Sequence, residues 1–224
     1  MNLIVLALAP VAAILLYIYI KDKYEKEPLR LLFYSFVLGT VVSVILTVIL
    51  SFVYNTILPL PDNGSILQQF IKAFLVVALT EEFSKYVVVR YFAQPKKAFN
   101  ERFDGIVYAV MVSMGFAATE NIFYVLGGGY EVALLRAFTA VPAHATFGIL
   151  MGYFMGKAKF SRNRTTLNLY GLLFAVLFHG AYDFFLFINF IPGTWTGALV
   201  SLVIAIFLSR KVIKKHQDSS RFRL

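Results

Sequence analysis

Long apolar runs separated by short polar loops dominate the chain. They lie at residues 3–20, 31–54, 70–92, 105–126, 132–155, 169–188 and 196–208. Apart from the last, which is short, these runs have about the 18–20 apolar residues that a membrane-spanning helix needs. The pattern predicts an all-α, polytopic membrane bundle of about seven helices, formed as one transmembrane domain over residues 1–224.

The composition agrees with a membrane protein. Of the 224 residues, 59% are hydrophobic and 15% are charged, whereas a soluble domain is about 45–50% apolar and about 25% charged. The polar loops are too short to hold a separate soluble domain. The chain contains no cysteine, which excludes disulfides and thiolate chemistry.

Basic residues are confined to alternate loops. Lys and Arg gather around residues 21–30, 90–102 and 157–164 and in the tail at 209–224, while the loops at 55–69, 127–131 and 189–195 contain none. The positive-inside rule then places the N-terminus outside and the tail in the cytoplasm. Because the net charge of +9 lies beside membrane spans, it predicts a lipid bilayer as partner and no nucleic acid.

Small residues recur at four-residue spacing in several runs, which is typical of the faces through which membrane helices pack. In the run 31–54 this stripe is interpreted as a packing seam. In three later runs the stripes continue into polar residues, namely Asn121, His144, and His179 with Asp183. An ionisable group facing lipid is costly, so these side chains are expected to point into the bundle.

Two adjacent carboxylates lie at membrane depth. Glu81 and Glu82 are in the middle of the run 70–92, and Lys85 follows three and four residues later, on the same helix face, where it can pair with them. Even lenient insertion scales assign about 2.5–3.5 kcal/mol to one charged carboxylate at this depth. The pair therefore needs a partner, a reduced charge or a hydrated cavity.

Other helices offer ionisable groups at a similar depth. From a rise of about 1.5 Å per residue, Glu81, His144 and His179 fall near the middle of their spans, with Glu120 and Asp183 roughly 6–7 Å nearer the outside. Two imidazoles and four carboxylates are thus expected in one layer. Such a layer is suited to hydrolysis, because a buried carboxylate can act as a general base.

The remaining polar residues in the spans have simpler predicted roles. Lys72 and Arg136 lie in the first turns of their spans and are expected to reach the outer lipid headgroups. Asp104 is expected to cap the N-terminus of the helix at 105–126. Asn121 is interpreted as a structural bridge between helices.

The pair His179 and Asp183 is one helical turn apart, so Asp183 can orient the imidazole. An oriented His–Asp pair can stabilise an oxyanion or protonate a leaving amine. The chain has no plausible nucleophile elbow and no Ser–Lys dyad. Water is therefore the expected nucleophile.

Three motifs resemble those of the PrsW family of intramembrane proteases, within the wider superfamily of CAAX-type endopeptidases. They are Glu81-Glu82-x-x-Lys85, Phe116-x-x-x-Glu120-Asn121 and His179-x-x-x-Asp183, in the same helix order. The resemblance implies a protease of the bacterial plasma membrane. It would make the first cut in a membrane-anchored anti-sigma factor, near its outer membrane end, and so start a stress response.

The resemblance also implies roles for single residues. Glu81 would correspond to the glutamate that activates water and Glu82 to its partner, while His179 and Asp183 would match the superfamily's His-x-x-x-Asp or Asn motif. Glu120 stands where the superfamily has His, so His144 on the next helix is a candidate replacement. The residues alone leave open which of the two adjacent glutamates is the base.

Three other interpretations remain beside this cofactor-independent peptidase: a zinc peptidase, an ion carrier and a scaffold without catalysis. Two His with one carboxylate, Glu120 or Asp183, would suit zinc and leave one position open. The candidate ligands are therefore Glu120, His144, His179 and Asp183, although no HExxH motif is present. Intramembrane carboxylates with His also form proton or cation relays. In a carrier or in a scaffold without catalysis, peptide cleavage would not depend on Glu81.

Overall fold

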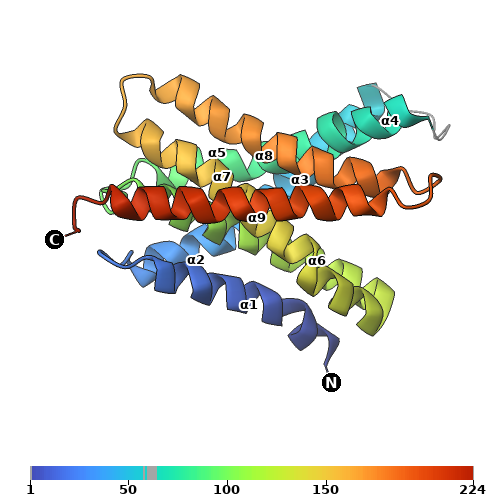
Figure 1. Ribbon diagram of the computed structural model, residues 1–224, viewed down its shortest axis with the longest axis horizontal. Helices are drawn as coiled ribbons and strands as arrows, with labels where there is room; N and C mark the ends of the chain where they lie inside the picture. The colour runs from blue at the N-terminus through green and yellow to red at the C-terminus, as the bar shows by residue number, and fades with distance from the viewer. Residues whose placement is uncertain (1, 58, 60–64, 224) are drawn as a thin grey trace.

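The computed structural model describes residues 2–57, 59 and 65–223, and every regular element in these ranges is a helix, as predicted (Figure 1). The loop predicted at 55–69 lies partly outside the described residues. The elements are α1 (Leu3–Lys21), α2 (Leu29–Leu38), η1 (Gly39–Ser43), α3 (Val44–Ile57), α4 (Ile66–Ile71), η2 (Lys72–Ala78), α5 (Leu79–Val88), η3 (Val89–Ala93), α6 (Phe103–Phe138), α7 (Ala140–Lys159), α8 (Arg164–Phe187) and α9 (Trp195–Asp218).

Five helical stretches are long and apolar enough to cross a membrane: Leu3–Lys21, Leu29–Ile57, Phe103–Lys159, Arg164–Phe187 and Trp195–Asp218. The predicted third span corresponds to the continuous helical run 66–93, which carries the ionisable residues and is not among the five. The neighbouring helices, α8 above all, pack against this run and place it within the bundle. The count of seven spans stays a prediction.

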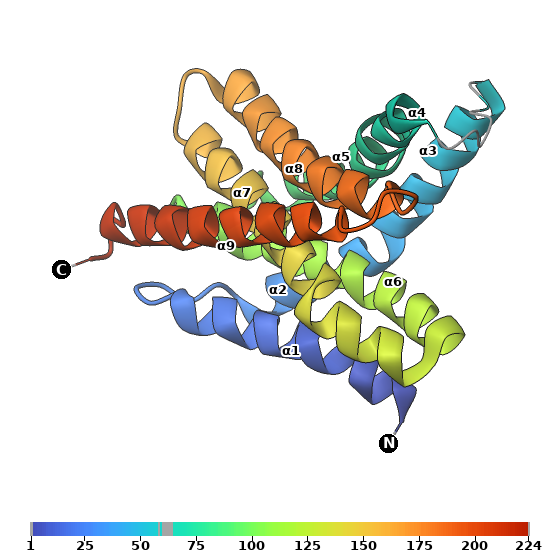
Figure 2. The ribbon, with the colours of Figure 1, turned by 45° about the vertical axis from the view of Figure 1, so that its right-hand side comes forward.

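The longest of these stretches reverses direction. Gly129 has φ +72° and ψ −156° inside α6, a left-handed conformation that glycine adopts at little cost. Figure 2 shows the chain turning back there, so that residues 130–138 and α7 return along the bundle. The reversal lies within the loop predicted at 127–131.

The segments rich in basic residues meet at one end of the bundle, on the left of Figure 1. Hydrogen bonds connect them: the Asn100 side chain donates to Glu25, and Gln217 donates to the Lys21 carbonyl. The N-terminus and the connection between α8 and α9 lie at the opposite end. This arrangement agrees with the alternation of the charges, while the inside–outside assignment stays a prediction.

Large apolar side chains cover the outside of the bundle. Phe52 is 72% exposed, Phe138 74% and Phe207 66%, values that would mark an aggregation-prone surface in water. Lipid is an adequate solvent for such side chains. The interior is built instead from small residues that allow the helix backbones to approach closely.

Glycine pairs show how close this approach is. A Cβ on Gly152 would lie 2.3 Å from the Gly105 carbonyl oxygen, and a Cβ on Gly39 would lie 2.1 Å from that of Val112. Ser35 and Ser43 of the same stripe are buried. The stripe in the run 31–54 is therefore a packing seam, as predicted, and it contacts α6.

Asp104 does not cap the helix in the way the sequence predicted. The helix begins at Phe103 after Arg102, without a side-chain cap. Because Asp104 lies inside the first turn, its Oδ2 accepts hydrogen bonds from the backbone N–H groups of Asn100 and Glu101, at 2.6 and 2.8 Å. It thus orders the preceding loop.

The predicted tail at 209–224 is largely helical. α9 continues past the predicted end of the last span to Asp218. His216, for which the sequence predicted no role, is 2% exposed and packs on Tyr153 with ring centroids 4.5 Å apart. The end of α9 is therefore part of the packed bundle.

We predict that Gly152→Ala destabilises the protein by about 1–3 kcal/mol, the usual cost of overpacking. The added Cβ meets only backbone atoms of Gly105 and Ile106, which cannot rotate away. Thermal unfolding in detergent measures the change. Gly127→Ala is the matched control, because a Cβ there meets nothing within 4 Å, and an unchanged transition for Gly152→Ala would contradict the close packing.

Candidate active site

The helical run 66–93 presents both glutamates to the bundle interior. Glu81 and Glu82 lie in the first turn of α5, and π-helical segments η2 and η3 precede and follow that helix. π-Helical turns are rare and concentrate at functional sites. Glu82 is 0% exposed, whereas Glu81 is 9% exposed.

The Lys85 ammonium lies among three acceptors. Its Nζ is 2.7 Å from Glu82 Oε1, 3.4 Å from Glu81 Oε2 and 3.3 Å from His144 Nδ1. It also lies 4.1 Å from the ring centroid of Phe116, a cation–π contact. The predicted pairing of Lys85 with both glutamates is therefore present in the structure.

The His179 imidazole lies between carboxylates from two helices. Its Nδ1 is 2.9 Å from Glu82 Oε1, and its Nε2 is 3.2 Å from Asp183 Oδ2 and 4.0 Å from Glu81 Oε2. Phe147 stacks on the ring with centroids 4.8 Å apart and planes at 14°. An imidazolium that donates from both nitrogens satisfies Glu82 and Asp183 together.

His144 is held by a different set of groups. Its Nε2 is 2.8 Å from Glu120 Oε2, and its Nδ1 faces Lys85. A carboxylate can only accept and an ammonium can only donate, so Nε2 carries the proton and Nδ1 accepts. Both nitrogens of His144 are thus engaged within the protein.

Arg136 differs from the sequence-based prediction. Instead of reaching headgroups, it donates to Glu120 Oε2 at 2.8 Å and to Asn121 Oδ1 at 2.7 Å. The reversal at Gly129 brings residues 130–138 back beside the earlier residues of α6, so that Arg136 lies next to Glu120. Asn121 also donates to the Ala7 carbonyl at 2.7 Å, so it bridges helices as predicted.

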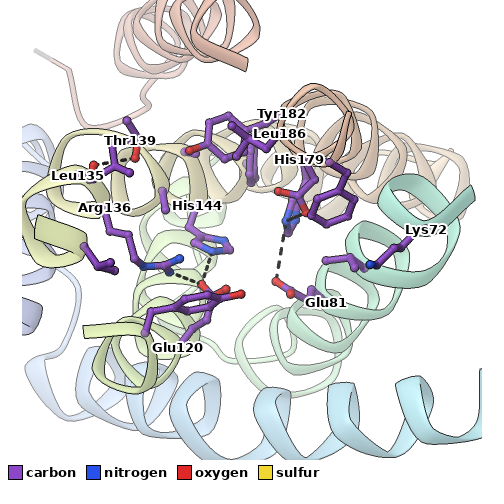
Figure 3. A pocket seen from close by; sticks show the side chains of 18 residues that line it. Lys72, Glu81, Glu120, Leu135, Arg136, Thr139, His144, His179, Tyr182 and Leu186 are labelled. Atoms are coloured by element: carbon purple, nitrogen blue, oxygen red, sulfur yellow. Dashed lines mark hydrogen bonds and ion pairs between the residues drawn. The ribbon is translucent and has the colours of Figure 1, made fainter. Parts of the chain in front are cut away.

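A cavity of about 610 Å³ opens between these groups. Figure 3 shows Glu81 and His179 on one side of it, and Glu120, His144 and Arg136 on the opposite side. Asp183 and Tyr182 of α8 also line the space. Glu82 and Lys85 lie behind the wall and contact the lining residues without belonging to them.

The site offers a set of metal-ligand atoms. One atom from each of Glu81, Glu82, His144 and His179 lies within 4.8 Å of all the others, and imidazole and carboxylate are donors that zinc accepts. For a bound metal, the sequence made Glu120 and Asp183 the candidate carboxylates. They contact the two imidazoles, at 2.8 Å from His144 and 3.2 Å from His179, while the tight four-residue group contains the adjacent glutamates.

The donor set fits a metal in type and spacing. In this structure the Lys85 ammonium lies among these ligand atoms, where a metal ion would lie. It contacts three of the four ligand residues, while Glu82 Oε2 is buried without a hydrogen-bond partner in the described structure. A metal ion at this place would require Lys85 to withdraw.

The structure thus brings all the predicted site residues into one region. Sequence reasoning missed Arg136 as a site residue and did not consider Phe147. The signal for Arg136 was weak: an arginine near the outer end of a span is common, and its partner lies 16 residues away, across a chain reversal.

Comparisons with known proteins agree with this geometry. A family model described as PrsW family intramembrane metalloprotease matches residues 27–210. A protein named Protease PrsW from Geobacillus kaustophilus is 40% identical over 186 residues, covering 83% of this chain and 80% of the relative. Those from Bacillus subtilis and Clostridioides difficile are 38% and 30% identical, covering 80% and 99% of this chain and 80% and 94% of their own lengths.

No solved structure matches the chain. The matches favour the enzyme interpretation over the carrier and the scaffold, and they extend across nearly all the helices that build the cavity. The chain therefore belongs to the PrsW family of intramembrane proteases, and it is a multi-pass bacterial membrane protein with protease activity.

Proposed function

We propose that the protein is an endopeptidase in which Glu81 activates a water molecule and His179 stabilises the oxyanion. The observation that carries this proposal is the position of Glu81. It is the one of the two adjacent glutamates that lines the cavity, and its Oε2 lies 4.0 Å from His179 Nε2. A water and a peptide carbonyl can both reach this pair from the cavity.

Glu82 is better suited to hold the other groups in place. It is fully buried, and its Oε1 accepts from Lys85 at 2.7 Å and from His179 at 2.9 Å. A carboxylate engaged in this way is a poor base for a water in the cavity. It fixes the His179 ring so that Nε2 faces the cavity.

In the proposed step, Glu81 takes a proton from water while the water oxygen bonds to the scissile carbonyl carbon. The carbonyl oxygen becomes an oxyanion, and the Nε2–H of His179 turns from Asp183 Oδ2, 3.2 Å away, to donate to it. The proton held on Glu81 then passes to the amide nitrogen as the C–N bond breaks. The products are a free amine and a new carboxyl group.

Arg136, Glu120 and His144 form the opposite wall of the cavity. Glu120 accepts from both Arg136 Nη2 and His144 Nε2 at 2.8 Å, and the other nitrogen of His144 faces Lys85. These residues are positioning residues in the proposal: they fix the His144 tautomer and, through it, the place of the Lys85 ammonium.

If a metal were bound, Glu81, Glu82, His144 and His179 would hold it, and it would supply a polarised water and a Lewis acid. The position of Lys85 favours the metal-independent mechanism, because its ammonium already contacts both glutamates where the metal would lie. Binding a dication there would leave a second positive charge buried beside it.

The proposed substrate is a single-pass membrane protein of the anti-sigma-factor class, cut near its outer membrane end. The family membership supports this class. The cavity supports the side of the cut: Lys72, Leu186 and Phe187 line it and lie toward the end of the bundle opposite the basic segments. The positive-inside rule makes that end the outer one.

We predict that Glu81→Gln lowers the rate of cleavage of a membrane-anchored substrate by about 10²–10⁴-fold, as expected for loss of a general base. The amide keeps the shape of the side chain but cannot accept the proton. The purified protein in detergent with an anti-sigma-factor peptide measures the rate, and fragment masses locate the cut. Glu131→Gln, at an exposed carboxylate, is the control, and undiminished cleavage by Glu81→Gln would contradict the assignment.

We predict that cleavage survives removal of metal ions. The Lys85 ammonium already lies against Glu81 and Glu82 where a metal would bind, so chelation should leave the rate within about twofold, with less than stoichiometric zinc by elemental analysis. Loss of activity on chelation, followed by recovery with added zinc, would instead support the metal-dependent mechanism.

We predict that Arg136→Gln destabilises the protein and that adding Glu120→Gln recovers part of the loss. Removing one partner of a buried ion pair leaves the other charge uncompensated, which costs about 3–5 kcal/mol for a fully buried pair. We expect a smaller loss of stability here, because the Arg136 and Glu120 side chains are 13% and 23% exposed. Thermal unfolding measures both variants.

The matched control is Lys72→Gln. Lys72 lines the same cavity but contacts an aromatic ring, Phe187, and forms no ion pair in the described structure. Its variant should unfold near the wild-type temperature. A double variant less stable than Arg136→Gln alone would show that the ion pair is not what Arg136 contributes.

A further inference from the structure

Three basic side chains gather where η3, α7 and α8 meet, at the end of the bundle that holds the other basic segments (Figure 1). Arg90 lies in η3, Lys159 is the last residue of α7, and Arg164 is the first residue of α8. All three side chains are half-buried. We call these three residues the basic cluster.

The buried side chain of Gln94 connects the members of the cluster. Its Oε1 accepts from Arg90 Nη1 at 2.8 Å and from Arg164 Nη2 at 3.2 Å, while its backbone carbonyl accepts from the Lys159 ammonium. The side-chain Nε2 of Gln94 donates to Asn168 Oδ1 at 2.9 Å, which fixes the direction of the amide. Because two guanidinium groups share one oxygen atom, they lie close together.

No carboxylate neutralises these charges at short range. None of the ion pairs in the described part of the chain includes Arg90, Lys159 or Arg164. Asp104 is near enough to attract Lys159, but it lies beyond ion-pair distance. The oxygen of Gln94 belongs to a neutral amide and cannot balance two cations. The basic cluster therefore carries uncompensated positive charge.

Arg164 also has an open hydrogen-bond donor. Its Nε is buried and has no acceptor within the described structure, a state in which buried polar atoms of native proteins are rarely left. The 24-residue helix α8 begins at this residue without a side-chain cap, so its first N–H groups add partial positive charge at the same place. An anion beside Arg164 would serve both the open donor and the helix end.

The surface next to the cluster is apolar. Tyr91, the neighbour of Arg90 in the chain, is 71% exposed, and Leu169, which follows Asn168, is 53% exposed. The Arg90 guanidinium lies 5.6 Å from the centroid of the Tyr91 ring. Exposed side chains of this kind cover the lipid-facing surface of the bundle. A ligand that suits both features has an anionic group joined to apolar chains.

We propose that the basic cluster binds the phosphate of an anionic phospholipid. Guanidinium groups match phosphate oxygens through paired N–H donors, and basic pockets between membrane helices on the cytoplasmic side bind anionic headgroups. The positive-inside rule predicts that this end of the bundle is the cytoplasmic one. Arg90 and Arg164 bind the phosphate oxygens, and Lys159 supplies a third positive charge.

The bound phosphate would join two elements that also meet at the active site. Arg90 lies in the helical run that carries Glu82, and Arg164 begins the helix that carries His179. Glu82 and His179 are in contact at 2.9 Å within the bundle, while Arg90 and Arg164 meet only through Gln94. The phospholipid should therefore stabilise the protein by holding these two elements together at their ends.

Thermal unfolding of the full-length protein in detergent tests the proposal, with phosphatidylglycerol, phosphatidylcholine or inorganic phosphate added. We expect phosphatidylglycerol to raise the unfolding temperature in a saturable way, and the other two to have little effect at the same concentration. Native mass spectrometry should show one retained phosphatidylglycerol. Arg90→Gln and Arg164→Gln should each weaken its binding at least about fivefold, as expected for loss of one basic residue at a membrane surface.

Arg162→Gln is the matched control, because Arg162 is exposed, carries the same charge and lies in the loop directly before α8. Its binding should stay within about twofold of the wild type, since exposed charges are screened by salt. An equal loss in Arg162→Gln would show general charge attraction and overturn the proposal. The proposal also fails if phosphatidylcholine stabilises as well as phosphatidylglycerol, if inorganic phosphate alone reproduces the effect, or if both arginine variants unfold earlier but retain the full response to phosphatidylglycerol. Should Arg164→Gln not fold, Arg90→Gln on the other element decides.

Discussion

The contact between the Lys85 ammonium and the two adjacent glutamates is the interaction on which the site depends. Taking charges out of water is costly, and removing one partner of a buried pair is costlier than removing both. Lys85 contacts Glu81, Glu82 and His144 from the centre of the group. Because His179 donates to Glu82 as well, the lysine and the histidine together hold a carboxylate that is 0% exposed.

This arrangement needs helix backbones that approach closely. The Ser113 hydroxyl donates to the His144 carbonyl at 2.7 Å and so ties α6 to α7 beside the site. Thr47 and Ser84 share a hydrogen bond of 2.8 Å that ties α3 to α5. In lipid, such contacts and small residues replace the hydrophobic effect as the source of helix association. The glycine pairs of α6 and α7 are therefore part of what places His144, although they lie away from the cavity.

Patterns that repeat along one helix were predictable from the sequence, and contacts between distant helices were less so. The four-residue stripes placed His144, His179 and Asp183 on inward faces, and the spacing of Lys85 from the glutamates predicted their pairing. Arg136 was assigned to the headgroups because its position near the end of a span was visible, while its contact with Glu120 across the predicted loop at 127–131 was not. Asp104 was taken for a cap because the sequence does not show that α6 begins two residues before the predicted start at 105, at Phe103.

The position of Lys85 also bears on whether the site binds a metal ion, as the description of the family as metalloproteases implies. A metal ion and the Lys85 ammonium would compete for the same oxygen and nitrogen atoms, since three of the four candidate ligand residues already contact Nζ. A metal could enter only if Lys85 moved away from these three residues. The Lys85 ammonium is part of the chain, so it is present without binding of an ion from solution. This position favours the metal-independent mechanism proposed above, in which Glu81, the less tightly held of the two glutamates, acts on water.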